Sequence, residues 1–209
     1  WGLRSAFIIR WPGHVKPGTT TAAMIQYEDV LPTLVELAGG TPPADIDGLS
    51  FASVLTGQKS EHRSHVFAVH NNVPEGRPYP IRAVRTARHK LILNLAPAGG
   101  YHEKHVMDID REDYWKSWEQ AAAAGDAKAR QAIDLYVKRP GVELYDCDND
   151  PWELTNLADK GELADLRVDL ERRLRQWMTR QNDTGAALDV ELPPARKGDK
   201  AKKAKKKQP

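Results

Sequence analysis

Cysteine and long apolar runs are what this chain of 209 residues has least of. It has one cysteine, Cys147, and therefore neither an intramolecular disulfide nor a cysteine-rich zinc site. Its apolar run at residues 6–9 is far shorter than the roughly 20 residues that a helix needs to cross a bilayer, so we expect no membrane span. The fold must come from ordinary burial of side chains.

Complete catalytic motifs are missing as well. The sequence has no P-loop, no G-x-G-x-x-G, no G-x-S-x-G and no H-E-x-x-H. Cys147 lies between Asp146 and Asp148, whose negative charge should raise the pKa of the thiol and disfavour the thiolate. The acidic turn at residues 146–150 lacks the glycine at the sixth place and the distal glutamate of an EF-hand, which favours a hydrogen-bonded turn that caps the next helix. We therefore expect neither a catalytic residue nor a metal ligand in this chain.

The charge is unevenly divided along the chain. Residues 196–209 carry eight Lys and Arg and one Asp, a net charge of +7, which leaves residues 1–195 with 23 basic and 28 acidic residues and a net charge of −5. The basic tail has no aromatic side chain for base stacking and no folded basic module beside it, so we expect no nucleic-acid partner. Residues 183–209 are predicted to be a disordered linker and a lysine-rich tail.

Hydrophobic periodicity predicts a mixture of helices and strands. The predicted strands are residues 5–11, which read as buried, and residues 66–69, 81–86, 90–95 and 142–145, of which 81–86 and 90–95 form a hairpin. The predicted helices are residues 25–38, with the regular part beginning near residue 29, and residues 50–55, 109–124, 126–137 and 162–181. The last of these helices must pack its apolar stripe onto something, most simply the sheet.

One polar loop between two predicted strands is a candidate binding site. It holds His70, Asn71, Asn72, Glu75 and Arg77. Such donors and acceptors suit a polyhydroxylated or anionic ligand, and rigid strands on both sides would position them. A solvated hairpin loop is the alternative.

The order of several motifs resembles the C-terminal part of a sulfatase. The segments are W-G-L-R-S-A-F-I-I-R-W-P-G (residues 1–13), Y-E-D-V-L-P-T-L-V-E-L-A-G (27–39), I-D-G-L-S-F-A-S-V-L-T-G (46–57) and E-L-Y-D-C-D-N-D-P-W-E-L-T-N-L-A (143–158). Residues 67–86 and the K-L-I-L-N-L after them look most like the heparan N-sulfatase (sulfamidase) branch and related bacterial polysaccharide sulfatases. Those enzymes hydrolyse sulfamate or sulfate groups on glycosaminoglycan-type sugars.

The resemblance implies a mechanism whose reacting groups are not in this sequence. In that family a Cys or Ser matured to formylglycine attacks sulfur while a calcium ion neutralises the sulfate oxygens. The C/S-x-P-S-R motif and the metal ligands would lie upstream of Trp1, so we expect a fragment that is inactive alone and binds neither calcium nor formylglycine itself. A processed mature terminus is the alternative explanation of a chain that begins without methionine.

The resemblance also implies the architecture and the partners. Residues 1–60 should be the truncated end of a sulfatase α/β domain of the alkaline-phosphatase superfamily, and residues 64–182 a small antiparallel-sheet subdomain packed by the long C-terminal helix. His70, Asn71, Asn72, Glu75 and Arg77 should select the sulfated sugar substrate, and the missing N-terminal domain should supply the nucleophile. Relatives of this kind work outside the cytoplasm or in lysosomes, so we expect an extracytoplasmic protein.

Two other functions remain open at this point. A phosphohydrolase of the same superfamily would share the α/β core but carry an upstream Thr or Ser nucleophile with two zinc ions. A non-catalytic module would bind sulfated glycans without turnover.

Overall fold

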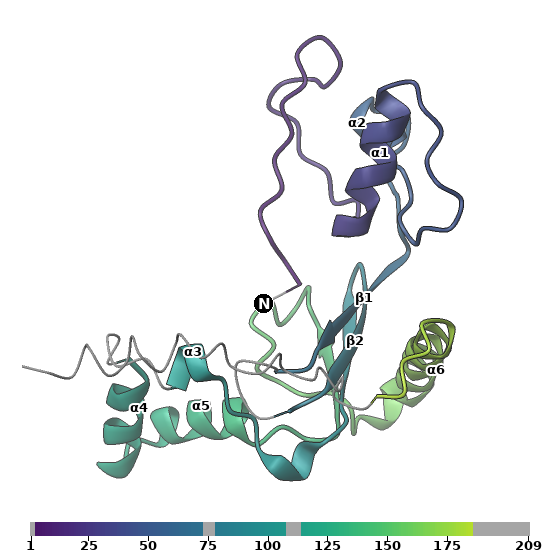
Figure 1. Cartoon of the computed structure of the whole chain (residues 1–209). Coiled ribbons are helices and arrows are strands. Elements are labelled where there is room, and N and C mark those ends of the chain that lie inside the picture. The colour runs from purple at the N-terminus through teal and green to yellow at the C-terminus, as the bar shows by residue number, and fades with distance from the viewer. Residues whose placement is uncertain (1–2, 73–77, 108–113, 186–209) are drawn as a thin grey trace, which may run out of the picture. The chain divides into compact units, whose positions relative to one another are not determined.

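The computed structural model describes residues 3–72, 78–107 and 114–185, and the chain divides into two compact units (Figure 1). Unit 1 takes its residues from Trp1–Val69, Arg82–Leu93 and Val142–Asn182, and unit 2 from His70–Ile81, Asn94–Gly141 and Asp183–Pro209. Across the described ranges no helix is both long and apolar enough to span a bilayer. The boundaries predicted from the resemblance, at residues 60 and 64, stay a prediction, and the predicted tail falls mostly outside the described residues.

A small antiparallel four-stranded sheet forms the core of the fold. Its strands are β1 (His65–His70), β2 (Ile81–Thr86), β3 (His89–Asn94) and β4 (Val142–Asp146), in the order β1-β2-β3-β4. β3 pairs antiparallel with β4, with Leu91 opposite Leu144 and Lys90 opposite Tyr145. Because side chains alternate along a strand, this register puts Leu91, Leu93 and Leu144 on one face and Lys90, Ile92 and Tyr145 on the other. The predicted strands from residue 66 onward are thereby confirmed.

The long C-terminal helix buries the stripe that its sequence predicts. α6 (Ala164–Arg180) follows the short 3-10 turn η3 (Gly161–Leu163) and buries Leu170, Leu174 and Met178. The ring of Trp177 stacks on that of Phe67 in β1, with centroids 4.9 Å apart and planes 11° from parallel. An amphipathic helix is thus fixed onto an edge strand by an aromatic pair.

The remaining side of β1 is covered by a side chain rather than a strand. The Gln26 side-chain amide donates to the Phe67 carbonyl at 3.1 Å and accepts from the Phe67 N–H at 3.4 Å. Met24 and Arg63 form an isolated antiparallel bridge nearby in sequence. A glutamine amide satisfies the edge as a neighbouring peptide would, which protects the edge from pairing with other chains.

The prediction of a buried strand at residues 5–11 is wrong. This segment has no regular secondary structure, Phe7 is 44% exposed and Ile8 is 90% exposed. A strand forms only where a neighbour completes its hydrogen-bond ladder, and no segment of the described chain does so for these residues. The segment is apolar, as a strand would be, but no described segment of the chain pairs with it.

Two of the family-like motifs fold onto each other through one buried carboxylate. α1 (Val30–Leu37) follows the 3-10 turn η1 (Tyr27–Asp29), and α2 (Ala52–Leu55) lies beside it (Figure 1). Asp29 has no exposed surface; it accepts from the backbone N–H of Leu49 at 2.8 Å and from Nε of Arg63 at 2.8 Å. Thr33 accepts from the N–H of Phe51 at 3.0 Å. The helix motif therefore binds the following D-G-x-S motif directly.

Gly48 explains the glycine in that second motif. A Cβ atom built there would lie 2.0 Å from the carbonyl oxygen of Glu28 and 3.1 Å from Cγ of Pro32. Only a residue without a side chain allows this close approach of two backbones.

The last motif builds a loop that returns onto β4. Asn156 accepts from the N–H of Leu144 at 2.9 Å and donates to the Val142 carbonyl at 3.1 Å. Glu153, at a φ of +57°, forms an ion pair with the buried Lys90 of β3. The motif residues are structural, and they hold the loop over the sheet.

The described residues of unit 2 form short helical elements. These are η2 (Pro97–Gly99), α3 (Lys104–Met107), α4 (Tyr114–Ala123) and α5 (Ala127–Val137). Asp126 caps α5 by accepting from the N–H groups of Lys128 at 2.8 Å and Ala129 at 3.1 Å. The predicted pair of helices around Gly125 is confirmed, and the first residues predicted for the earlier one lie outside the described chain.

Candidate functional site

β1 carries its C-terminal polar residues into unit 2. His70, its last residue, is exposed, Asn71 is half-buried and Asn72 is buried. β1 pairs with β2 in the sheet, and the ring of Phe67 within it stacks on Trp177 of α6. Three of the five predicted site residues are thus consecutive at one strand end.

Asn72 fixes the turn that follows the strand. Its φ is +56°, in the left-handed region that asparagine tolerates better than most residues. It is 2% exposed, and its Nδ2 donates to the carbonyl of His102 at 2.6 Å. The side chain therefore ties the loop to residues 101–102.

The two ends of the polar loop are joined by a backbone hydrogen bond. The N–H of Tyr79 donates to the carbonyl of Asn71 at 3.0 Å. Glu75 and Arg77, the other two predicted site residues, lie between them and outside the described residues. Their predicted role as ligands of the substrate stays a prediction.

Tyr101 lies directly against His70. Its Oη is 3.3 Å from Nε2 of His70, and the two rings meet edge-on with centroids 6.1 Å apart. The N–H of Tyr101 donates to the carbonyl of Val137 at 2.9 Å, which anchors it to the end of α5. Tyr101 is 8% exposed, so its hydroxyl supports His70 from the interior.

Further aromatic rings hold Tyr101 in place. Tyr79 and Tyr136 both contact it edge-on, with centroids 5.2 Å and 5.5 Å away. The guanidinium carbon of Arg139 lies 5.3 Å from the centre of the Tyr101 ring, within the range of a cation–π contact. His70 therefore contacts Tyr101, which packs against two further aromatic rings and the guanidinium of Arg139.

Sequence reasoning missed Tyr101 and Arg139. Tyr101 follows His70 by 31 positions, and no period or motif links residues so far apart. The carbonyl of His102 accepts the hydrogen bond from Asn72. In the sequence, the one visible feature of His102 is that it lies three residues before another histidine. The supporting groups could be found only from the fold.

Both tyrosines under the site remain protonated at neutral pH. Burial raises the pKa of Tyr101, and the positive charge of Arg139 opposes that rise. Burial also raises the pKa of Tyr136 to about 12. Each phenol can therefore donate a hydrogen bond but is not a base near neutrality.

The cysteine and the acidic turn do not form a reactive centre. Burial is the main cause that raises the pKa of the Cys147 thiol, and the charge of Asp146 contributes less. The predicted rise in pKa is therefore correct, but the predicted cause, the neighbouring negative charge, is secondary. Hydrogen bonds from Arg88 and Asn149 lower the pKa of Asp146. The turn is hydrogen-bonded as predicted, but the expectation that it caps the next helix is wrong, because that helix begins only at Gly161.

Within residues 3–72, 78–107 and 114–185 no three His, Cys, Asp or Glu side chains come together as a metal site would require.

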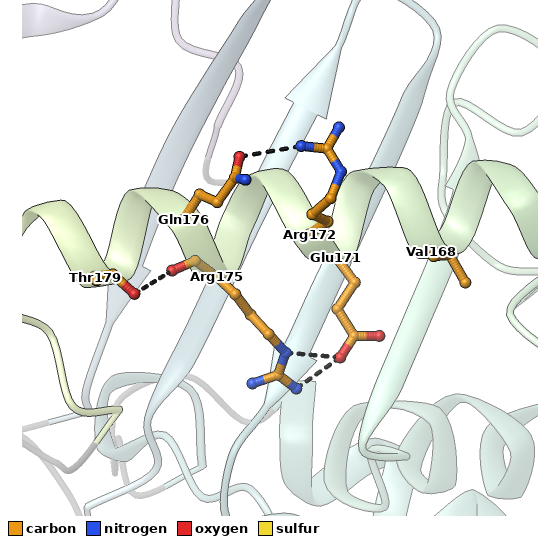
Figure 2. A pocket seen from close by; sticks show the side chains of 6 residues that line it. All are labelled: Val168, Glu171, Arg172, Arg175, Gln176 and Thr179. Carbon is orange, nitrogen blue, oxygen red and sulfur yellow. Dashed lines mark hydrogen bonds and ion pairs between the residues drawn. The ribbon is translucent and has the colours of Figure 1, made fainter.

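A cavity of about 440 Å³ on the outer face of α6 is lined by charges that are already paired. Figure 2 shows Arg175 reaching Glu171 one turn away, with Nε and Nη2 at 2.9 Å and 2.6 Å from Oε1. Arg172 donates to Gln176 at 3.1 Å with the same spacing. Pairs four residues apart stabilise an exposed helix, and they explain this surface without a ligand.

A second cavity, of about 450 Å³, is apolar and lies in unit 1. Its walls include Phe7 and residues 9–11 of the N-terminal segment, Leu34 of α1, Leu55 of α2 and Phe51, which precedes α2. Leu31 and Leu34 on α1 are 55% and 60% exposed. The surface around residues 5–11 therefore has apolar side chains without cover.

The sequence of the chain matches one protein family. The family model of the N-sulphoglucosamine sulphohydrolase C-terminal region matches residues 2–112, a range that includes His70, Tyr101 and His102. An ulvan-active sulfatase of Formosa agariphila is 32% identical over 184 residues, which cover 87% of this chain and 34% of that protein. Human arylsulfatase A is 27% identical over 188 residues, which cover 90% of this chain and 32% of that protein.

Solved structures show the same fold. A protein determined in complex with its substrate D-glucosamine-2-N,6-O-disulfate superimposes with a TM-score of 0.59 at 22% identity, over 87% of this chain and 29% of that one. This chain spans about a third of the length of the curated relatives named above. With more than half of its residues matched by the family model, the chain belongs to the family of sulfatase C-terminal regions typified by N-sulphoglucosamine sulphohydrolase.

Proposed function

We propose that this chain is the C-terminal part of a sulfatase that hydrolyses sulfate ester or sulfamate groups on glycosaminoglycan-like sugars. In this proposal the chain supplies scaffold and substrate recognition, and the reacting groups belong to the rest of a longer polypeptide. The observation that carries it is the exposed polar strand end at His70 and its contact with the buried Tyr101, both inside the range matched by the family model.

The chemistry of that strand end suits a sulfated sugar. His70 is exposed at the end of β1, so its imidazole is accessible to a ligand, and the half-buried Asn71 follows it in the chain. Such groups donate to sulfate oxygens and exchange hydrogen bonds with sugar hydroxyls. We place Glu75 and Arg77 in the same recognition loop, where the guanidinium of Arg77 would pair with a second anionic group.

The residues that the structure describes do not fit the family's cofactors. The thiol of Cys147 has its pKa raised by burial, and a matured nucleophile in that turn would be followed by acidic residues rather than by the family's motif. Nor is there a three-ligand cluster for calcium in those same ranges. We therefore assign formylglycine and Ca²⁺ to the remaining polypeptide, where they would supply the nucleophile and neutralise the sulfate oxygens, and we derive no step through them.

The uncovered apolar surface of unit 1 supports a longer polypeptide. Ile8 is 90% exposed and Leu34 60%, beside an apolar cavity of about 450 Å³. Contiguous apolar surface of this kind marks an interaction site in a stable protein. We propose that this apolar surface packs against the rest of the longer polypeptide.

The test compares the isolated chain with the whole polypeptide from the same gene. The whole protein should hydrolyse a chromogenic aryl sulfate and release sulfate from N-sulfoglucosamine or from 6-O-sulfated N-acetylglucosamine, while the isolated chain should hydrolyse neither. Hydrolysis of a phosphate monoester in preference to every sulfate would favour the phosphohydrolase alternative. Retention of a sulfated glycan without turnover by the whole protein would favour the binding-module alternative.

A further inference from the structure

The contact between Tyr101 and His70 has a specific consequence for the proton on the imidazole ring. A neutral histidine carries one N–H, on either Nδ1 or Nε2, and the partner of one nitrogen decides which form is present. Here Nε2 of His70 lies 3.3 Å from Oη of Tyr101. The direction of this hydrogen bond therefore determines what Nδ1 can offer to a ligand.

The surroundings of Tyr101 favour its hydroxyl as the donor. Tyr101 is 8% exposed, and His70 is its one hydrogen-bond partner for the hydroxyl among the residues that the structure describes. If the buried O–H of Tyr101 did not donate to Nε2, the donor would be left without this hydrogen bond, which costs free energy in a buried position. The positive charge of Arg139, 5.3 Å from the ring centre, makes the phenol a better donor by opposing the effect of burial on its pKa.

We propose that Tyr101 is a positioning residue that holds neutral His70 as the Nδ1–H tautomer, so that an N–H donor is presented to the oxygen of a sulfate group or sugar hydroxyl. This inference rests on the proposed function for the identity of the ligand, but the tautomer itself does not depend on it. Free histidine prefers the Nε2–H form, in which Nδ1 would be an acceptor and would repel an anionic oxygen. One buried hydroxyl thus changes the outward nitrogen of His70 from an acceptor to a donor.

The aromatic rings around Tyr101 make this arrangement rigid. Tyr79 and Tyr136 contact the Tyr101 ring from 5.2 Å and 5.5 Å, and the Tyr101 N–H is bonded to the Val137 carbonyl. The packed ring therefore has little freedom to move its hydroxyl oxygen away from His70. Replacing Tyr101 with phenylalanine keeps these ring contacts and removes only the oxygen.

The experiment is nitrogen NMR of the whole protein with ¹⁵N-labelled histidine at pH 8.5, well above the ordinary histidine pKa of about 6.5. The His70 resonances are assigned by their loss in His70→Gln. In the wild type we expect a protonated, pyrrole-type Nδ1 and an unprotonated, pyridine-type Nε2. Tyr101→Phe should exchange the two assignments, while Tyr136→Phe, which removes a hydroxyl that does not contact His70, should leave them unchanged.

The outcomes separate this inference from the proposed function. A pyridine-type Nδ1 in the wild type, or the same tautomer in wild type and Tyr101→Phe, overturns the role of Tyr101. In steady-state assays we expect Tyr101→Phe to lower kcat/KM on a sulfated oligosaccharide about fivefold, the value of one ordinary hydrogen bond. The expected tautomer together with unchanged kcat/KM in His70→Gln would support the inference and refute the assignment of His70 to substrate recognition.

Discussion

Replacing Asp29 by asparagine should destabilise the protein strongly. Its side chain accepts hydrogen bonds from Gln26 N–H at 2.9 Å, Leu49 N–H at 2.8 Å and Arg63 Nε at 2.8 Å, and His62 Nε2 lies 3.2 Å away. Asparagine removes the charge that compensates the guanidinium and turns an N–H₂ group toward other donors. Breaking a buried ion pair from one side costs about 3–5 kcal/mol.

We take about 3 kcal/mol for Asp29→Asn, because the remaining amide oxygen still accepts one backbone N–H. For a chain of this size that corresponds to a fall in Tm of about 6–12 °C, measured by circular dichroism at 222 nm. Asp169→Asn is the matched control, because Asp169 also forms ion pairs, with Arg172 and Arg173, but on the solvated face of α6. Exposed pairs contribute about 1 kcal/mol or less, so its Tm should fall by only a few degrees.

The same carboxylate predicts a dependence on pH. Burial acts to raise the pKa of Asp29, but the hydrogen bonds from Arg63, Leu49 and Gln26 outweigh it and lower the pKa. A carboxyl whose pKa is lower in the folded state stabilises the fold above its unfolded pKa of about 3.9 and loses that contribution as pH falls through the folded value. The stability difference between wild type and Asp29→Asn should therefore shrink below about pH 4. Equal losses of Tm in Asp29→Asn and Asp169→Asn would refute the reasoning.

Three further predictions concern packing, a buried charge and the thiol. Gly48→Ala should cost about 1–3 kcal/mol because its Cβ meets backbone at 2.0 Å, whereas Gly161→Ala, with open space, should change the midpoint of urea unfolding little. Glu153→Ala leaves buried Lys90 without its ion pair and should lower the free energy of unfolding by about 3–5 kcal/mol. The double variant Glu153→Ala with Lys90→Met should regain part of that loss. Equal stability of the single and the double variant would contradict this prediction. Because burial raises the pKa of the Cys147 thiol, iodoacetamide should alkylate the folded protein about tenfold more slowly at pH 8 than the urea-unfolded protein, and faster alkylation when folded would be the opposite result.

The elements that the sequence predicts well are those whose partners lie close along the chain. The alternation at residues 81–86 and 90–95 produced a hairpin, and the leucine spacing of residues 163–174 produced α6, because each pattern has one period and one buried face. The prediction of a strand at residues 5–11 was wrong for the converse reason. Its composition is that of a strand, but pairing is a property of two segments, and the described chain offers it no second one.

The motifs that carried the family resemblance proved to be structural. Asp29, Thr33 and Gly48 join two helices and a loop, and Glu153 and Asn156 hold the loop after β4. Such residues identify the fold because each has a specific partner in it. They say little about the ligand, which the resemblance alone associated with the polar loop.

The candidate site could be only half predicted from sequence. His70, Asn71 and Asn72 were found because a polar cluster between two strands is visible locally. Tyr101 was not found, since its relation to His70 arises from the way residues 94–141 fold back onto the strand end within unit 2. Contacts of that kind follow from tertiary packing and leave no local pattern.

The most direct test of substrate recognition at the end of β1 is the kinetics of His70→Gln in the whole protein. On a sulfated oligosaccharide kcat/KM should fall about tenfold or more, as expected for the loss of a hydrogen bond to a charged group. On a small aryl sulfate, which lacks the sugar, kcat/KM should stay within about twofold of wild type, and Lys128→Gln on the exposed side of α5 should affect neither substrate. Unchanged kcat/KM on the oligosaccharide, or an equal loss on both substrates, would contradict a recognition role for this strand end.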